Sequence, residues 1–433
     1  MDKFLVTGGT PLQGTIQISG AKNSALPCMA AAILTQDEVI LENIPNVRDI
    51  HTERKLLASM GADVEIIDHG NTRFTNIRCA TLSDPVAKYE IVKTMRASSL
   101  VLGPLVARTG LARVAMPGGC AIGGRPIDLH IKGLEKMGAT ITQEHGYLEA
   151  RAERLKGAHL VFDKITVTGT EDLLMAAVLA EGETLMENCA REPEVVDLAQ
   201  LLIAMGARIE GAGTATVRVQ GVTSLHGARH RIQPDRIEAG TFLIAGAITG
   251  GDLTVAGCNS THLGAVISKL QEAGAQVDIL AQDAVRVRAG SNLRAVDIST
   301  EEYPGFPTDM QAQFMALATQ ADGVSVVMEN IFENRFMHVQ ELVRMGANIK
   351  LDGRTATVRG KSPLSATSVM CSDLRASASL VLAALVANGQ SVLDRVYHMD
   401  RGYERIEEKL RGVGAKIARV SNVPADIAEE AFA

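Results

Sequence analysis

Tryptophan is absent from this chain of 433 residues, and only 3% of the residues are aromatic. The core must therefore be packed from small and aliphatic side chains, and the 40 glycines indicate many tight turns. No apolar run approaches the roughly 18 residues that span a bilayer, and the segment after Met1 lacks the apolar stretch of a secretory signal. We therefore expect a cytoplasmic protein without membrane insertion.

Positive charge is also scarce. The formal net charge is −7 and no broad basic stripe is present, which argues against a nucleic-acid partner. An anionic ligand would have to be bound by a local cluster of arginine and lysine. The six cysteines form no CxxC pair, which indicates a reducing compartment without a disulfide framework. The histidines show no metal-ligand spacing, and we expect neither a metal nor a cofactor.

An internal repeat dominates the rest of the sequence. An apolar residue followed by Gly-Ala and then by a strand recurs six times, and the glycines of this signature, about 70 residues apart, are Gly61, Gly138, Gly206, Gly274, Gly346 and Gly414. Each repeat contains an alanine-rich helix such as Ala376–Ala387, a short strand, an amphipathic helix such as Leu263–Ala273 and a hairpin such as Val277–Val287. The glycine suits the C-terminal cap of the amphipathic helix.

Helices made of alanine and serine are thin, so they suit a buried position where several helices meet, with sheets outside. We therefore predict two α/β domains, each built from three repeats with helices inside and sheets outside. The polar, proline-containing segment Arg229–Asp235 places the boundary near residue 230. A ligand site is expected in the cleft between the two domains.

One loop is set apart by its composition. Residues 117–126 read P-G-G-C-A-I-G-G-R-P, so that two glycine pairs flank Cys120 and Arg125 follows. Such a segment can close as a lid, and a nearby guanidinium lowers the pKa of a thiol. Cys120 is therefore a candidate general acid or nucleophile. The other five cysteines are expected to be small core residues: Cys28, Cys79, Cys189, Cys258 and Cys371.

Charged residues recur where the alanine-rich helices begin. Lys22 and Asn23 open the first helix, Arg96 opens the second, and Asp373 and Arg375 open the sixth. Helix N-termini favour anions, so these cations indicate a phosphate or carboxylate site.

Three further candidates lie in the second half of the chain. Asp309 begins the fifth helix, either as a catalytic carboxylate or as an ordinary N-cap. Arg335 and Arg401 follow strands in loops that correspond to the Cys120 loop, and guanidinium groups suit bidentate binding of carboxylate and phosphate.

The whole chain resembles the UDP-N-acetylglucosamine 1-carboxyvinyltransferases, enolpyruvyl transferases of bacterial peptidoglycan synthesis. The resemblance rests on six motifs, which are Ser19–Asn23, Lys93–Ser98, the Cys120 loop through His130, Phe306–Gln311, Glu333–His338 and Asp400–Arg405. It implies an inverted α/β barrel in each domain. It also implies that the N-terminal strand joins the second domain, so that domain 1 is residues 22–233 and domain 2 is residues 1–21 plus 234–433.

The resemblance further implies transfer of the enolpyruvyl group of phosphoenolpyruvate to the 3′-hydroxyl of UDP-N-acetylglucosamine, with release of phosphate. It identifies Cys120 as the proton donor, which can also form a covalent adduct, and Asp309 as the base. Lys22, Arg125 and Arg401 correspond to the clamp on phosphate and carboxylate. The implied nucleotide-sugar contacts are Asn23, Arg96, Arg125, Pro126, Ile127, Asp128, Leu129, Lys164, Ile165, Thr166, Val167, Asp309 and Ile331. Asp373 and Arg375 correspond to supporting or closure residues.

Three alternatives remain. The sister enzyme that acts on shikimate 3-phosphate shares the six repeats and the donor chemistry but lacks the Cys120 loop motif. A non-catalytic nucleotide-sugar sensor on the same scaffold should have lost Cys120, Asp309 or a clamp residue, and all of these are present. An RNA-end cyclase of related architecture would need a nucleotide-accepting histidine and a basic RNA face, and neither is found.

Overall fold

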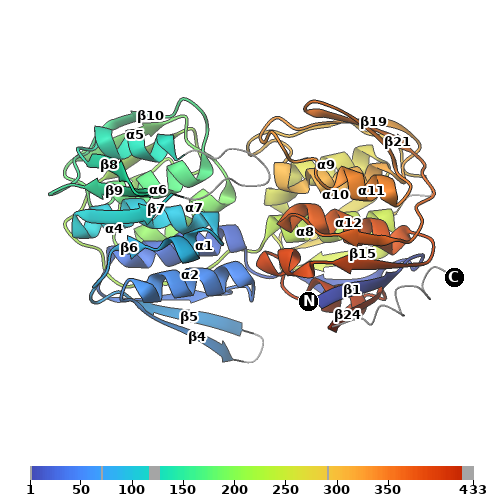
Figure 1. Ribbon diagram of the computed structural model, residues 1–433, viewed down its shortest axis with the longest axis horizontal. Helices are drawn as coiled ribbons and strands as arrows, with labels where there is room; N and C mark the ends of the chain where they lie inside the picture. Colours follow the sequence, from blue (N-terminus) through green and yellow to red (C-terminus); the bar gives the residue numbers. More distant parts are fainter. Residues whose placement is uncertain (1, 70–71, 117–126, 290–291, 422–433) are drawn as a thin grey trace. The chain divides into compact units, whose positions relative to one another are not determined.

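The computed structural model describes residues 2–69, 72–116, 127–289 and 292–421 (Figure 1). Contacts between Cα atoms divide these residues into two compact units. The first unit contains residues 2–19 and 234–421, and the second contains residues 20–116 and 127–233. Each unit has a hydrophobic core of its own.

Three four-stranded sheets of one topology form the outer layer of the second unit. Their strands are β3 (Glu38–Glu42), β4 (Asp63–His69), β5 (Thr72–Arg78), β6 (Val86–Ala87), β7 (Leu111–Ala115), β8 (Thr140–Glu144), β9 (Tyr147–Arg151), β10 (His159–Val161), β11 (Glu183–Glu187), β12 (Arg208–Glu210), β13 (Thr216–Gln220) and β14 (Arg229–Arg231). The strand orders are β14-β3-β5-β4, β6-β7-β9-β8 and β10-β11-β13-β12. In each sheet a parallel edge strand joins three antiparallel strands of one repeat, so every repeat is tied to another.

The first unit repeats this arrangement with strands from both ends of the chain. Its strands are β1 (Asp2–Thr7), β2 (Gln13–Gln17), β15 (Asp252–Ala256), β16 (Gln276–Ala281), β17 (Ala284–Arg288), β18 (Ile298–Ser299), β19 (Gly323–Met328), β20 (Asn348–Asp352), β21 (Thr355–Gly360), β22 (Ser368–Met370), β23 (Gln390–Asp394) and β24 (Lys416–Ser421). The sheets run β16-β17-β15-β2, β18-β19-β21-β20 and β22-β23-β1-β24. Strand β1 lies between β23 and β24, with Phe4 opposite Leu393 on one side and Arg419 on the other.

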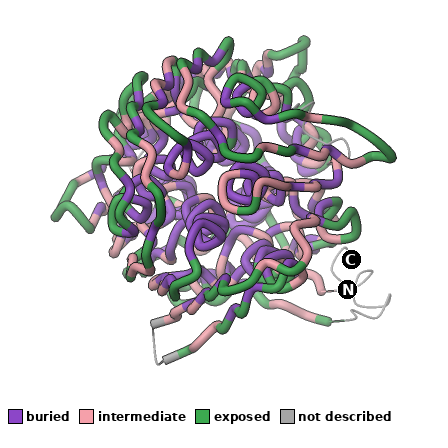
Figure 2. Tube along the Cα trace, turned by 90° about the vertical axis from the view of Figure 1, so that its left-hand side faces the viewer, coloured by how far each residue is buried: buried purple, intermediate pink, exposed green. Residues whose placement is uncertain are grey.

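Three alanine-rich helices fill the centre of each unit. They are α1 (Lys22–Ala31), α4 (Leu102–Thr109) and α6 (Val167–Ala177) in the second unit, and α8 (Arg236–Ile248), α10 (Gln311–Ala318) and α12 (Leu374–Val386) in the first. Every residue of α10 is buried, and Figure 2 shows buried segments along central helices. Small residues such as alanine let these helices approach one another closely, and larger side chains such as Phe314 are buried with them. The predicted fold, with helices inside and sheets outside in each unit, is confirmed.

A second set of helices, called the covering helices, packs against the inner helices or the sheet strands and ends just before the recurring glycines. These helices are α2 (Arg48–Ser59), α5 (Asp128–Lys136), α7 (Pro193–Ala204), α9 (Gly264–Glu272), α11 (Val339–Arg344) and α13 (Ile406–Gly412). The six Gly-Ala glycines have φ between 93° and 104°, in the left-handed region that favours glycine after a helix. The repeat signature is therefore a helix-ending signal, as predicted.

Short helices complete the chain, and several of them precede inner helices. They are α3 (Tyr89–Val92) and the 3₁₀ helices η1 (Ala32–Leu34), η2 (Arg96–Val101), η3 (Ser260–Leu263), η4 (Thr308–Met310) and η5 (Val396–Arg401). The sequence predicts one helix over Ala97–Ala107, whereas the structure has η2 followed by α4. Pro104 is the third residue of α4, where a backbone N–H has no acceptor within the helix, so its missing N–H costs no helical hydrogen bond.

Candidate active site

Asp309 lies in η4, directly before the inner helix α10, and is held by two arginines. Arg335 Nη2 is 2.6 Å from Asp309 Oδ1, and Arg375 Nε is 3.4 Å from Oδ2. The arginine side chains are 6% and 3% exposed, whereas 26% of the Asp309 side chain is exposed. An N-cap was the alternative role for Asp309, but the N-cap positions of η4 and α10 are Pro307 and Met310. The carboxylate is thus oriented by guanidinium groups and still reachable from solvent.

Arg375 is fixed from the side opposite Asp309. Its Nη2 lies 3.5 Å from Asp235 Oδ2, and its guanidinium carbon lies 5.0 Å from the centre of the Tyr403 ring. Tyr403 is itself buried and its hydroxyl is 2.9 Å from Thr241 Oγ1. Burial opposes the charge of Arg375, but Asp235, Tyr403 and Asp309 outweigh it and raise the pKa above the ordinary value. Arg375 is therefore a permanent buried cation.

Asp373 and Arg401 belong to the same unit as this cluster. The Asp373 side chain caps α12 by accepting hydrogen bonds from the N–H groups of Arg375 and Ala376, both at 2.9 Å. Burial lowers the pKa of Arg335, but the negative charge of Asp309 and then that of Asp373 outweigh burial and raise the pKa. Arg401 is the last residue of η5 and is partly exposed.

In the second unit, Lys22 begins the inner helix α1 with a buried counter-ion. Lys22 Nζ lies 3.0 Å from Asp49 Oδ2, and the two residues are 9% and 2% exposed. Asp49 comes from the first turn of the covering helix α2. The N-cap residue of α1 is Ala21, whose side chain cannot cap the helix, so the first N–H groups of α1 and the ammonium group together suit an anion. Asn23 follows and is half-buried.

The other candidates of the second unit begin η2, α5 and α6. Arg96 is the first residue of η2 and Asp128 the first of α5. Both charges act on the buried His130: burial lowers its pKa to about 4, Asp128 opposes this and Arg96 reinforces it. Thr166 caps α6 by accepting a hydrogen bond from the Gly169 N–H at 3.2 Å. The remaining candidates are Ile127, the N-cap residue of α5, and Leu129 within α5. Lys164 and Ile165 precede α6, and Val167 is the first residue of α6.

Three repeats bury a titratable group at one shared position of the covering helix. Glu53, His130 and His338 each stand the same number of residues before the helix-ending glycine, where the other repeats have leucine, valine or isoleucine. Burial, followed by the charge of Asp49, raises the pKa of Glu53 to about 8. Burial lowers the pKa of His338 to about 4. All three groups are therefore held in the neutral form at pH 7, next to candidate site residues.

A family model described as EPSP synthase (3-phosphoshikimate 1-carboxyvinyltransferase) matches residues 6–410. A protein of Acidobacterium capsulatum named UDP-N-acetylglucosamine 1-carboxyvinyltransferase is 76% identical over 432 residues, which is 100% of this chain and 99% of the relative. The chain belongs to the enolpyruvyl transferases. A protein of the same name from Koribacter versatilis is 69% identical and covers 98% of each chain.

Solved structures of enolpyruvyl transferases have the same fold. The enolpyruvyl transferase NikO from Streptomyces tendae matches with a TM-score of 0.87 and 26% identity, over 98% of this chain and 99% of that one. EPSP synthase from Acinetobacter baumannii matches with a TM-score of 0.73 and 19% identity, over 97% and 100% of the chains. The first likeness agrees with the family and the second shows the fold alone.

Not every residue predicted for an enolpyruvyl transferase site is placed. Cys120, Arg125 and Pro126 lie outside the described residues. The five cysteines predicted as core residues are buried and free of disulfides. No described helix has both the length and the apolar character required to cross a membrane.

One group of described residues has the donor atoms of a possible metal site. Atoms of Cys28, Asp197 and His230 lie within 4.8 Å of one another. The Asp197 carboxylate already accepts hydrogen bonds from His230 at 2.9 Å and from the Gln233 N–H at 3.2 Å. Burial, with Asp197 and a second acid nearby, raises the pKa of the Cys28 thiol far above its ordinary value, which disfavours the thiolate that a metal requires. The group is better described as a hydrogen-bonded part of the core.

Sequence reasoning missed the partners of the predicted residues. Asp49, Asp235 and Tyr403 come from other elements than the cations they contact, and no local pattern marks them. Glu329, the residue after β19, was also missed. It could have been found by comparing repeats, because the corresponding residue of two other repeats is asparagine.

Proposed function

We propose that this chain transfers the enolpyruvyl group of phosphoenolpyruvate to the 3′-hydroxyl of UDP-N-acetylglucosamine and releases phosphate. The observation that carries the proposal is the 76% identity, across the full length of both chains, to a relative named for this activity. The family model carries the name of the shikimate enzyme, but relatives at 58% to 76% identity carry the name of the nucleotide-sugar enzyme.

In the proposed reaction, Cys120 donates a proton to the methylene carbon of phosphoenolpyruvate, so that C2 becomes electrophilic. Asp309 takes the proton of the sugar hydroxyl as the oxygen forms a bond to C2. The bond from C2 to the phosphate oxygen then breaks, phosphate leaves with its electron pair, and loss of a methyl proton restores the double bond. The arrangement of Asp309 supports its role, because the carboxylate is fixed by Arg335 and Arg375 yet partly exposed.

Cations of both units are assigned to the anionic groups of the substrates. We propose that Lys22, Arg125 and Arg401 bind the phosphate and carboxylate of phosphoenolpyruvate. Preorganised cations stabilise charge without reorganisation during the reaction, which favours Lys22, already fixed by Asp49 at 3.0 Å.

The nucleotide sugar is assigned to a larger set of residues. These are Asn23, Arg96, Arg125, Pro126, Ile127, Asp128, Leu129, Lys164, Ile165, Thr166, Val167, Asp309 and Ile331, with Arg335, Asp373 and Arg375 in support. The proposal requires that residues of both units act on one pair of substrates. It also places the enzyme in the cytoplasm, where phosphoenolpyruvate is produced, and requires no redox cofactor because no electrons are transferred to or from the substrates.

Phosphate release from phosphoenolpyruvate tests the proposal, with UDP-N-acetylglucosamine or shikimate 3-phosphate as the acceptor and with a chelator present. We expect release only with the nucleotide sugar. Release only with shikimate 3-phosphate would refute the assigned acceptor. Binding of the nucleotide sugar without release would indicate a sensor.

Three variants test the assigned roles. Cys120→Ser and Asp309→Asn should each bind the nucleotide sugar and lose most turnover, about a hundredfold or more. The exposed Lys164→Gln should chiefly weaken nucleotide-sugar binding. Full turnover in Cys120→Ser would contradict the proton-donor role.

A further inference from the structure

Glu329 is a buried carboxylate with four hydrogen-bond donors. It follows β19 directly and is 1% exposed. Its Oε1 accepts from the N–H groups of Ile331 at 2.9 Å and Phe332 at 3.0 Å, and from Thr300 Oγ1 at 3.0 Å. Its Oε2 accepts from Thr308 Oγ1 at 2.9 Å. Both oxygens are therefore occupied by protein donors, which is what a buried carboxylate requires to remain charged.

Comparison of the repeats shows that this carboxylate is an addition to the scaffold. In three repeats the same backbone hydrogen bond marks the end of the strand. The N–H groups of Ile232, Phe162 and Thr300 donate to the carbonyls of Glu42, Glu187 and Met328, respectively. The next residue is Asn43, Asn188 or Glu329, respectively. Asn43 and Asn188 donate to the carbonyls of Ile232 and Phe162, both at 2.9 Å.

In the fifth repeat, the hydrogen bond that Asn43 and Asn188 make in the other two repeats is made by Asn330, the residue after Glu329. Asn330 Nδ2 donates to the Thr300 carbonyl at 3.2 Å. The strand end is thus secured without Glu329, and the carboxylate is available for another role.

The first role concerns the direction of one hydroxyl proton. Thr308 Oγ1 has a single proton, which it donates to Glu329, so its lone pairs face other donors. Arg335 Nη1 donates to this oxygen at 2.8 Å, while Nη2 of the same guanidinium contacts Asp309 Oδ1 at 2.6 Å. The fork of Arg335 is therefore fixed at both nitrogens. A continuous chain of hydrogen bonds connects Glu329 to Asp309 through Thr308 and Arg335.

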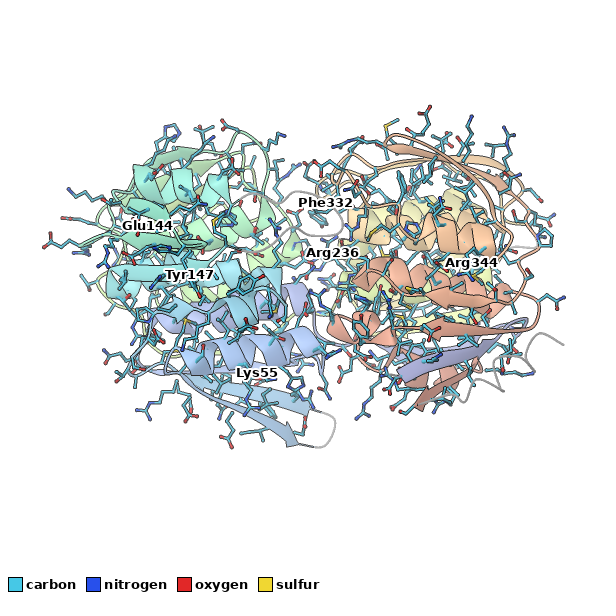
Figure 3. The ribbon with its side chains drawn as sticks, in the orientation of Figure 1. Lys55, Glu144, Tyr147, Arg236, Phe332 and Arg344 are labelled. Atoms are coloured by element: carbon cyan, nitrogen blue, oxygen red, sulfur yellow. The ribbon has the colours of Figure 1, made fainter. Side chains whose placement is uncertain are left out.

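The second role concerns the loop that follows β19. By accepting from two successive N–H groups, Glu329 fixes the backbone at Ile331 and Phe332. The guanidinium carbon of Arg335 lies 5.1 Å from the centre of the Phe332 ring, which is labelled in Figure 3. One carboxylate thus orients both the loop and the arginine that contacts it.

We infer that Glu329 is a positioning residue for the transfer reaction. It orients the Asp309 base through Thr308 and Arg335, and it holds the loop of Ile331 in place for the nucleotide sugar. The inference rests on the proposed function, since it presumes that Asp309 is the base and that Ile331 contacts the acceptor.

Glutamine at position 329 would break this arrangement with almost no change of shape. An amide has one acceptor oxygen and one donor nitrogen. If the amide oxygen of the glutamine keeps accepting from the N–H groups of the loop, the amide nitrogen points at Thr308 Oγ1. The amide nitrogen then competes with Arg335 for the lone pairs of the Thr308 oxygen. Arg335 then loses its alignment with Asp309, and Asp309 becomes easier to protonate.

The test compares the wild type with Glu329→Gln, Thr308→Val and the double variant, measuring kcat, KM for each substrate and the pH profile. We expect Glu329→Gln to lower kcat about ten- to a hundredfold, to raise KM for UDP-N-acetylglucosamine and to move the acidic limb of the profile to higher pH. Thr308→Val cuts the chain to Arg335 but leaves the loop contacts. It should therefore reproduce the kcat loss and the shifted limb, and it should raise KM for the nucleotide sugar less than Glu329→Gln does.

The double variant and a control complete the experiment. The double variant should have the kcat of Glu329→Gln, because both changes interrupt one chain. Glu333→Gln alters an exposed carboxylate of the same loop and should behave as the wild type. The inference, but not the proposed function, would be overturned if Glu329→Gln kept the kcat and the pH profile of the wild type. It would also be overturned if the kcat losses of the two single variants multiplied in the double variant without a shift of the acidic limb. A wild type that releases no phosphate with the nucleotide sugar would refute the proposed function and the inference with it.

Discussion

Replacement of Glu53 by glutamine should stabilise the protein at neutral pH and not at acidic pH. Glu53 is 1% exposed, and none of the described residues forms a hydrogen bond with its carboxyl oxygens. Burial and the charge of Asp49 raise its pKa to about 8, against 4.5 for an exposed glutamate. The folded chain therefore keeps a proton on Glu53 between these two pH values, and the unfolded chain releases it.

The sign and size of the effect follow from this difference. Where the folded state binds the extra proton, stability falls as pH rises, by about 1.4 kcal/mol per pH unit. Between pH 5 and pH 7.5 the wild type should lose about 3 kcal/mol through Glu53, and the loss should be complete above pH 8. Glutamine does not titrate and has nearly the shape of the protonated acid, so the variant lacks this loss.

The assay is chemical unfolding of the wild type and Glu53→Gln at pH 5 and pH 7.5. The free energies of unfolding should agree at pH 5, and the variant should be more stable by about 3 kcal/mol at pH 7.5. Glu65→Gln is the control, because Glu65 is exposed on the neighbouring strand β4. Equal stability of the wild type and Glu53→Gln at both pH values would refute the reasoning.

Three further predictions concern stability. His130→Leu should be more resistant to acid unfolding than the wild type. The buried His130 imidazole stays neutral in the folded state, so the wild type loses stability as pH falls from about 6.5 to about 4. In unfolding at pH 5, replacement of the exposed His159 by glutamine should give no such gain. Asp373→Ala should lower the free energy of unfolding by about 1 kcal/mol, whereas Asp373→Asn keeps the α12 cap and should stay near the wild type in the same assay. Arg108→Met should lower the melting temperature and the free energy of unfolding, the latter by about 3 kcal/mol, because the Arg108 guanidinium donates to three backbone carbonyls within 2.8 Å. An unchanged melting temperature would show that water replaces the guanidinium at these carbonyls.

The repeats made much of the fold predictable from sequence. Gly-Ala pairs marked helix ends because only glycine readily adopts the positive φ found there. Alanine-rich stretches marked inner helices because small side chains let helices approach closely, although larger residues such as Phe314 are buried there too. The repeat count alone could not place β1, since its partners Leu393 and Arg419 are almost a full chain length away. That placement followed from the family resemblance.

The candidate cations of the site were predictable from the sequence, but the contacts that they make in the structure were not. Lys22 and Arg96 could be found because a charge at the start of an alanine-rich helix is conspicuous. Their partners could not, since Asp49 belongs to another helix and a buried acid has no local signature. The N-cap role of Asp309 was excluded only by the structure, in which Pro307 and Met310 occupy the N-cap positions, and its catalytic role stays a prediction.

The position of β1 has a consequence for synthesis on the ribosome. The described strands of the second unit all lie between Glu38 and Arg231, so that unit can close its three sheets while translation continues. The first unit cannot, because β1 is made first and its partner β24 last. Until residue 421 has emerged, Phe4 and Val6 have no complete sheet to cover them, although both are fully buried in the finished fold. The nascent first unit should therefore be the half that needs a chaperone, and the half that aggregates when translation stalls.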